Sequence, residues 1–156
     1  MLLSGILKGL EGIPYPVVSA GVIFLDDFPA PLYDIKKEPV ASEMNLTITD
    51  YVHSVWWPDL VKLGKKYSIN YTAMTTFDYN ENTKPPFLFR EWDAKKIKKG
   101  NEEVGLSTWL SNDVLKNGHE LAFHGYNHVS LVAKEWKNPD FMVTSLKAAE
   151  KKWAVN

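Results

Sequence analysis

The sequence contains no cysteine. Disulfides, thiolate metal ligands and cysteine nucleophiles are therefore excluded. A chain without cysteine suits reducing and oxidising compartments equally, so the localisation stays open. The first residues, MLLSGILKGLEG, lack the basic segment and the long apolar run of a secretory signal, and we predict no signal peptide.

Long apolar runs and an excess of charge of one sign are also missing. No stretch approaches the roughly 18 apolar residues of a membrane span, so we predict no membrane span. The 18 Lys and Arg residues nearly balance the 19 Asp and Glu residues, and the formal net charge is −1. This balance gives no electrostatic reason to bind nucleic acid or an anionic membrane, and we predict no nucleic-acid partner.

The hydrophobic pattern that is present predicts one α/β domain. The chain has 156 residues, 45% of them hydrophobic, which is enough for a single domain over residues 1–156 with its own core. Predicted strands cover Val17–Leu25, 69–79 and 119–124, and predicted helices cover 54–68, 106–118 and 138–156. Strands that alternate with helices predict a parallel α/β sheet, open or barrel-like.

Local signals refine these elements. Val17–Leu25 is almost wholly apolar and rich in β-branched residues, which predicts a strand buried on both faces. Residues 80–105 show no steady period, and we predict a long insertion whose lysines are solvated. The residues placed to begin or end the helices are Pro58, Asp59, Ser107 or Thr108, Gly118 and Asp140. The last helix carries one apolar stripe, formed by Met142, Leu146, Ala149 and Trp153.

The segment GHELAFHGYNH, residues 118–128, holds three of the four histidines. His124 and His128 are four residues apart, a span of about 13 Å along a strand, which is too long for one metal ion. The intervening Gly125 and Asn127 disfavour a helix but tolerate a turn that brings His128 back towards His124. The two histidines therefore form either a metal site or a hydrogen-bonded turn. We predict that His119, at the start of the strand, and the isolated His53 are structural or exposed.

A second polar cluster, Asp26 and Asp27, ends the first predicted strand. Adjacent side chains point to opposite faces of a regular strand, so both carboxylates reach one site only if the strand breaks there. The carboxyl ends of parallel strands share one edge of the sheet, where chemistry gathers in α/β folds. Asp26, Asp27, His124 and His128 are thus predicted to lie on one rim, with the donors that a divalent metal needs.

The two clusters resemble motifs of the polysaccharide deacetylase superfamily, carbohydrate esterase family four and its relatives. In that family a hydrophobic strand ends in Thr-Phe-Asp-Asp, and a later Gly-His-Glu-rich strand leads into His-Ser/Thr-x-x-His. The corresponding segments here are IFLDDFP and GHELAFHGYNH. The resemblance implies a deformed (β/α) barrel and a hydrolase that removes acetyl groups from an N- or O-acetylated carbohydrate.

The resemblance also implies roles for individual residues. A divalent metal would be bound by Asp27, His124 and His128. Zinc is the first choice, and cobalt and nickel are other ions that suit these ligands. Asp26 would be the general base. No residue is assigned to substrate binding.

The chain departs from the family pattern in three places. Gly125 stands where a hydroxyl residue usually follows the first histidine, and Phe28 stands where glycine often follows the Asp pair, so we expect Phe28 to crowd the floor of the site. The later motifs, an arginine-proline strand and a leucine-histidine segment with the general acid, do not occur in this sequence. We therefore expect a domain incomplete at its C-terminal side, whose open sheet edge is covered by a missing segment or by another copy. The alternative function is a non-catalytic metal- or glycan-binding module with the same fold.

Overall fold

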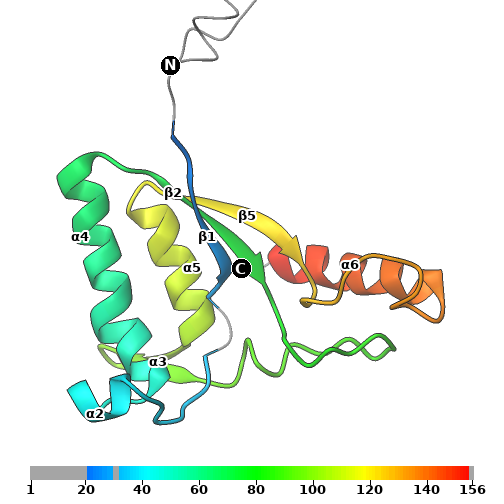
Figure 1. The fold of residues 1–156 in the computed structure, drawn as a ribbon, viewed down its shortest axis with the longest axis horizontal. Helices are drawn as coiled ribbons and strands as arrows, with labels where there is room; N and C mark the ends of the chain where they lie inside the picture. Colours follow the sequence, from blue (N-terminus) through cyan, green and yellow to red (C-terminus); the bar gives the residue numbers. More distant parts are fainter. Residues whose placement is uncertain (1–20, 30–31, 155–156) are drawn as a thin grey trace, which may run out of the picture.

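A three-stranded parallel sheet forms the centre of the protein (Figure 1). The structure, a computed structural model, describes residues 21–29 and 32–154. Strands β1 (Ile23–Phe28), β2 (Tyr71–Thr76) and β5 (Glu120–Gly125) lie in the order β1-β2-β5. The predicted parallel α/β arrangement is confirmed. In the part of the chain that the structure describes the sheet is open, and a closed barrel is not formed.

Helices follow the strands as the alternating pattern predicted. Residues 40–67 contain α2 (Val40–Met44), α3 (Ile48–Tyr51), the π-helical turn η1 (Val52–Trp56) and α4 (Trp57–Tyr67). α5 (Leu106–Lys116) precedes β5, and α6 (Pro139–Trp153) follows it. In Figure 1 α4 and α5 lie side by side, whereas α6 lies at the opposite end of the sheet. None of the described helices combines the length and the apolar character that crossing a membrane requires.

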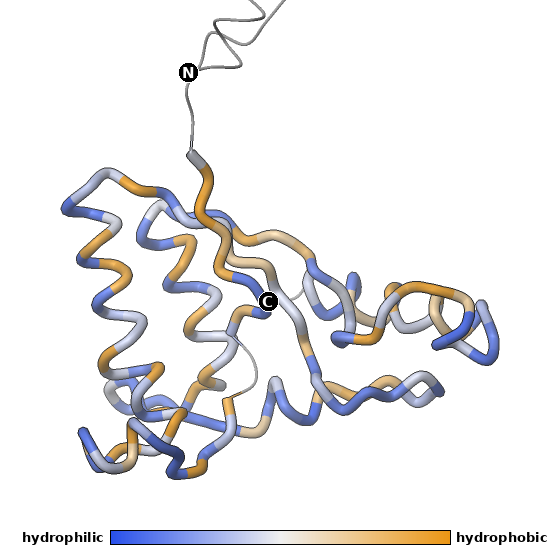
Figure 2. The backbone as a smooth tube through the Cα atoms, viewed as in Figure 1, coloured by the Kyte–Doolittle hydropathy of each residue, from blue (hydrophilic) through white to orange (hydrophobic). Residues whose placement is uncertain are grey.

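The main core lies between one face of the sheet and helices α4 and α5. Leu25, Ala73 and Leu121 are aligned across the three strands and pack against buried Trp57 and Leu110 of the helices. Along both helices apolar and polar residues alternate in Figure 2, as an amphipathic helix on a sheet requires. Each Leu or Val side chain that this face buries completely contributes about 1.5–3 kcal/mol. The sheet and these two helices therefore form a stable platform for the loops at the carboxyl ends of the strands.

The prediction of a first strand buried on both faces is wrong. β1 begins at Ile23, and residues 17–20 of the predicted strand lie outside the described residues. β1 is an edge strand, and Phe24, which points away from the helices, is 61% exposed. The apolar run could not show that only one face of this strand is covered by described residues. That a missing segment or a second copy covers the open sheet edge stays a prediction.

The helix predicted over residues 54–68, with Pro58 in its first turn, begins earlier. Its N-cap is Thr47, whose side chain accepts a hydrogen bond from the Asp50 amide, and helical structure then runs without a break to Tyr67. Pro58 therefore lies inside a helical run, where it offers no N–H and its ring crowds the carbonyl four residues back. The π turn directly before α4 widens the backbone at that point and accommodates the ring.

Two predicted caps are also corrected. α5 begins after Gly105 with no side-chain cap, so Ser107 and Thr108 lie inside its first turn. Asn138 rather than Asp140 caps α6, because the Asn138 side chain accepts the Asp140 amide hydrogen at 2.9 Å. Gly118 follows α5 with φ of 78°, as its predicted role at the helix end requires. In α6, Ala149 is buried, and its predicted stripe faces the protein.

A small antiparallel hairpin was missed in the insertion. β3 (Lys96–Lys99) pairs with β4 (Glu102–Gly105) around Gly100, whose φ is 64°. The hairpin lysines are exposed, as predicted, and the Lys99 ammonium lies 3.8 Å from the centre of the Trp109 ring. Four-residue strands rich in lysine and glutamate carry too weak an alternation to be recognised from the sequence.

Candidate metal centre

The structure brings Asp27, His124 and His128 together at the carboxyl ends of β1 and β5. Asp27 Oδ1 lies 3.4 Å from His124 Nε2, and Asp27 Oδ2 lies 3.6 Å from His128 Nε2. One ligand atom from each of the three side chains lies within 4.8 Å of the other two. Zinc binds nitrogen and oxygen ligands at about 2.0–2.2 Å, which places two ligand atoms roughly 3.3 Å apart around one tetrahedral ion. The two separations between Asp27 and the histidines are close to this value, and all three ligand atoms lie within 4.8 Å of one another.

A break in β1 allows both aspartates to reach this centre. Asp27 has φ of 55°, and the pairing with β2 shifts between Leu25 and Phe28. Asp26 and Asp27 consequently do not point to opposite faces as in a regular strand. Asp26 Oδ1 lies 3.6 Å from His124 Nε2, and the Asp26 side chain is 69% exposed. Asp26 thus stands beside the three side chains, open to water.

Phe28 does not crowd the site, contrary to the expectation from the sequence. It rejoins the ladder opposite Thr75 and is 2% exposed. Its ring lies 5.6 Å from that of Trp57 and 6.4 Å from that of Trp56. The bulge at Asp27 turns Phe28 to the helix-covered face of the sheet, so a large side chain at this position stabilises the core.

The turn after β5 is held by the loop that follows β2. Gly125 has φ of 128°, a conformation that strains any other residue and explains the absence of a hydroxyl side chain there. Tyr126 is buried, and its hydroxyl donates to the Leu88 carbonyl at 2.8 Å. The side-chain amide of Asn127 donates to the Asn82 carbonyl at 2.9 Å. These non-local contacts fix the turn that returns His128 towards His124.

Tyr79, three residues beyond β2, is a component of the site that the sequence reasoning missed. Its ring stacks on His128 with centroids 5.7 Å apart and an interplanar angle of 13°. Burial raises the pKa of Tyr79, and its interaction with the Asp27 carboxylate raises this pKa further. Tyr79 comes just after the central parallel strand and therefore lies on the same rim. This position in the sequence could have identified it as part of the site.

One buried polar atom of this centre, Asp27 Oδ1, forms no hydrogen bond with the described residues. Buried oxygen atoms normally have a partner, and a bound ion or an ordered water is one way to supply it. Two imidazoles and one carboxylate form a typical ligand set of hydrolytic zinc sites that keep a position for water. The donors also suit cobalt and nickel. The residues present therefore fit a divalent metal.

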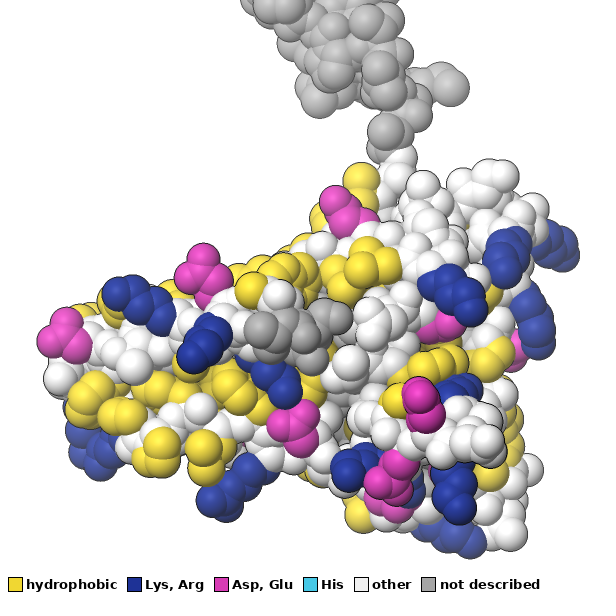
Figure 3. All heavy atoms as spheres, turned by 180° about the vertical axis from the view of Figure 1, so that it is seen from behind, with side chains coloured by type: hydrophobic (Ala, Val, Ile, Leu, Met, Phe, Trp, Pro, Cys, Tyr) yellow, Lys and Arg dark blue, Asp and Glu magenta, His cyan; other side chains and the backbone are white. Residues whose placement is uncertain are grey.

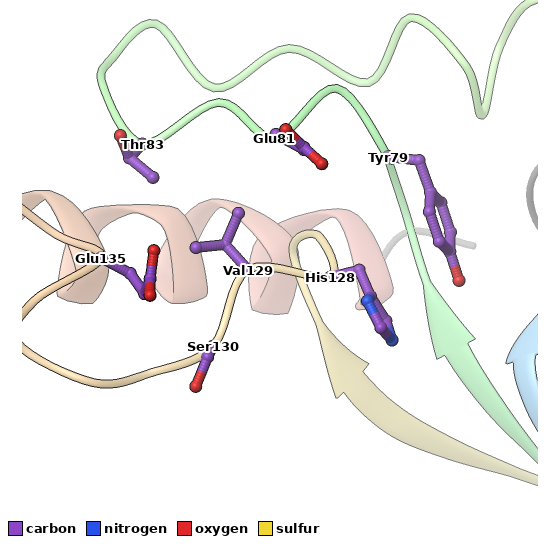
Figure 4. Close-up of a pocket in the computed structure, with 7 residues that line it drawn as sticks. All are labelled: Tyr79, Glu81, Thr83, His128, Val129, Ser130 and Glu135. Atoms are coloured by element: carbon purple, nitrogen blue, oxygen red, sulfur yellow. The ribbon is translucent and has the colours of Figure 1, made fainter.

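A cleft of about 480 Å³ adjoins this centre at His128 (Figure 4). Glu81 and Thr83 come from the loop after β2, and Ser130 and Glu135 come from the loop after β5. In Figure 4 the His128 and Tyr79 rings lie together at one end of this group of side chains. The lining is dominated by hydroxyl and carboxylate groups, which can bind a hydroxyl-rich ligand.

Figure 3 shows the molecule from behind, where hydrophobic side chains gather over the arm that carries α6 and no histidine is visible.

The other two histidines are structural, as predicted. His119 is 8% exposed, lies 4.9 Å from the Tyr71 ring between centroids, and accepts a hydrogen bond at Nδ1 from the Tyr71 amide at 3.4 Å. His53 packs its ring edge against Trp109 at 5.1 Å. Neither belongs to the cluster of Asp27, His124 and His128.

We expect His119 to make folding stability depend on pH. Burial lowers the pKa of His119 below its ordinary value of 6.5, and Lys65 lowers it further. The unfolded chain therefore takes up this proton first as the pH falls. The contribution of His119 to the free energy of unfolding is constant above about pH 6.5 and decreases as the pH drops from there to the lower folded-state pKa.

NMR titration of the His119 ring protons tests this expectation, together with denaturant unfolding at several pH values between 5 and 8. In His119→Gln the corresponding part of the pH dependence should disappear. A His119 pKa at or above 6.5 in the folded protein would contradict the prediction.

Together these features define an α/β protein with a candidate centre of two histidines and one carboxylate at the carboxyl ends of its parallel strands. The chain belongs to the family described as an uncharacterised protein conserved in bacteria, DUF2194, which matches residues 1–154. Comparison with curated proteins and comparison with solved structures gave no match.

Proposed function

We propose that this protein is a metal-dependent hydrolase that removes acetyl groups from an N- or O-acetylated carbohydrate. The observation that carries the proposal is the convergence of Asp27, His124 and His128, with the second carboxylate of Asp26 beside them. The resemblance of both motifs to polysaccharide deacetylases supports it. The proposal includes the finer fold, in which the three-stranded sheet is part of a deformed (β/α) barrel.

The residues have separate roles in the proposed reaction. Asp27, His124 and His128 would hold the ion, which when bound would lower the pKa of a water and polarise the substrate carbonyl. Asp26 accepts a proton from the attacking water, a role for which its exposed carboxylate lies close enough to His124. The bond between the acyl carbon and nitrogen or oxygen then breaks, the departing nitrogen or oxygen takes up the proton that came from the water, and acetate and a free amine or alcohol leave.

The cleft at His128 supports a carbohydrate as the substrate. Its hydroxyl and carboxylate groups match the donors of a sugar, and Tyr79 adds an aromatic ring at the inner end. A sugar bound there would place an acetylated amine or hydroxyl next to the imidazole of His128.

Metal content and acetate release test the proposal directly. Protein purified without chelators should contain about one divalent ion per chain, and the Zn²⁺-loaded protein should release acetate from acetylated chitooligosaccharides or acetylated xylan. Protein treated with a chelator should lose the activity and regain it with Zn²⁺. A protein that takes up no divalent ion contradicts the proposal.

The second candidate function is a non-catalytic metal- or glycan-binding module. The openness of the centre favours it, because the side chains of Asp26 and His128 are 69% and 59% exposed, whereas hydrolytic sites exclude water from the reacting groups. Binding of Zn²⁺ and of chitooligosaccharides without any acetate release would decide for this module.

We expect the Tyr79 hydroxyl to position Asp27 and the ring to position His128. Tyr79→Phe keeps the stacked ring but removes the hydroxyl beside Asp27, and we expect Zn²⁺ affinity to fall about tenfold, as for other groups that orient metal ligands. Isothermal titration with Zn²⁺ measures this change. Tyr67→Phe is the matched control, because Tyr67 is 59% exposed on α4, and it should leave the affinity unchanged. Equal affinities of Tyr79→Phe and the unaltered protein would exclude this role.

A further inference from the structure

A second cleft, of about 290 Å³, opens beside the two carboxylates of the candidate centre. Asp26 and Asp27 lie on its lining at the end of β1. The facing residues come from α2, α3 and η1, and they are aliphatic or aromatic: Val40, Ile48, Tyr51, Val52 and Trp56. These facing side chains are half-buried, so the cleft is apolar and accessible. Its lining differs in character from the hydroxyl-rich cleft at His128.

The two clefts lie on different sides of the candidate centre. The sheet order places β1, with Asp26 and Asp27, at one edge and β5, with His124, at the other. The apolar cleft is built from the end of β1 and the helices that follow it, whereas the polar cleft is built from the loops after β2 and β5. A substrate whose carbonyl lies at Asp27, His124 and His128 therefore has a polar environment on one side and an apolar environment on the other.

An acyl compound is likewise polar on one side of its carbonyl group and apolar on the other. Its leaving group is attached through nitrogen or oxygen, and its alkyl part lies on the other side of the carbonyl carbon. An acetyl group presents only one methyl, about the size of a water molecule, whose share of liquid volume is roughly 30 Å³. The apolar cleft is far larger than a methyl group requires, and an alkyl chain would bury several methylene groups against Val40, Ile48 and Val52.

We propose that the apolar cleft binds the alkyl chain of the acyl group, and that the protein prefers acyl groups longer than acetyl. This inference rests on the proposed hydrolase function and narrows its substrate class. Water adds its oxygen to the acyl carbon and its hydrogen to the departing nitrogen or oxygen, so the products are a short-chain or medium-chain carboxylate and an amine or alcohol. Because each buried methylene contributes about 0.8 kcal/mol, the preference should grow about fourfold per methylene until the cleft is filled.

The test uses the Zn²⁺-loaded full chain and two series of probes. Hydrolysis of N-acetyl-, N-butanoyl- and N-hexanoylglucosamine is measured as kcat/KM, and binding of acetate, butanoate and hexanoate is measured by calorimetry. We expect both quantities to increase from the two-carbon to the four-carbon compound by about tenfold or more. Equal values across the series would overturn the inference.

Val40→Phe narrows the cleft and tests whether the cleft itself sets the chain-length preference. Val40 lies in α2, which contains no buried residue, so the larger side chain should leave the core intact. We expect this variant to keep its Zn²⁺ content and to lose most of the preference for hexanoyl over acetyl compounds. Val143→Phe is the matched control, since Val143 is 43% exposed on α6, and it should keep the preference. If Val40→Phe disturbs folding, Val40→Ala takes its place in the test. Val40→Ala widens the cleft and should retain binding of hexanoate.

The outcomes distinguish this inference from the proposed function. Acetyl hydrolysis without any gain from longer chains would support the hydrolase and overturn the acyl-chain cleft. Binding of carboxylates that strengthens with chain length and is lost in Val40→Phe, without hydrolysis of any probe, would support the cleft as an alkyl-binding site and contradict the hydrolase. A preference for long chains that Val40→Phe leaves unchanged would place the alkyl chain elsewhere and overturn the inference.

Discussion

Asp27→Asn is expected to weaken Zn²⁺ binding more than about 100-fold while leaving the metal-free protein folded. Loss of a direct ligand should exceed the 10–100-fold effect of losing a group that only orients a ligand. Asparagine tolerates the φ of 55° at this position, so the bulge in β1 should persist, whereas alanine would add strain there. The substitution therefore tests the ligand and not the backbone.

Thermal unfolding with and without Zn²⁺ measures the effect. An ion present at 100 times its dissociation constant stabilises the folded state by about 2.7 kcal/mol, which raises Tm by roughly 5–10 °C for a chain of this length. The unaltered protein should show this increase, and Asp27→Asn should not. Asp59→Asn is the control, because Asp59 is an exposed aspartate on α4 that contacts Lys62. An increase in Tm of the same size in Asp27→Asn would remove Asp27 from the ligand set.

Asp26→Asn should have the opposite profile, with metal binding retained and turnover lost. Asp26 lies next to His124 but is largely exposed, and in the proposed reaction it accepts the proton of the attacking water. Removing such a general base reduces kcat by about 10²–10⁴-fold. Asparagine keeps the size of the side chain, so substrate binding should change little.

Acetate release under saturating substrate, together with the metal content of the same preparation, measures this prediction. The comparison with Asp27→Asn is informative because the two residues are adjacent. If Asp26→Asn also loses the metal, Asp26 is a ligand and not a base. If Asp26→Asn retains full kcat, the proton goes to another group.

The arrangement of the strands explains why the candidate centre was accessible to sequence reasoning. Asp26 directly follows one apolar segment, and His124 lies at the end of another. Parallel strands end at the same edge of a sheet. Two polar clusters nearly a hundred residues apart could therefore be placed on one rim before any contact was known. The condition that β1 must break for both aspartates to face the centre followed from the same alternation of side chains.

Other features of the site depend on contacts between distant segments. Tyr79 belongs to the centre because the loop after β2 packs along the turn after β5, and the backbone amides of Phe77 and Asp78 both donate to the Tyr126 carbonyl. No residue of the sequence motif indicates that the loop after β2 packs along the turn after β5. The role of Phe28 was wrongly predicted for a related reason, since the bulge at Asp27 decides which face of the sheet receives its ring.

The sequence by itself determined the order of the three sheet strands and of the longer helices between and after them, and the chemical nature of the side chains at the strand ends, because hydrophobic periodicity and turn residues are local properties. Only the tertiary structure decided the left-handed backbone at Asp27, the stacking of Tyr79 on His128 and the apolar cleft beside the carboxylates. These features arise where segments far apart in the chain pack together, and the energy of such packing depends on shape and burial that no short stretch of residues encodes.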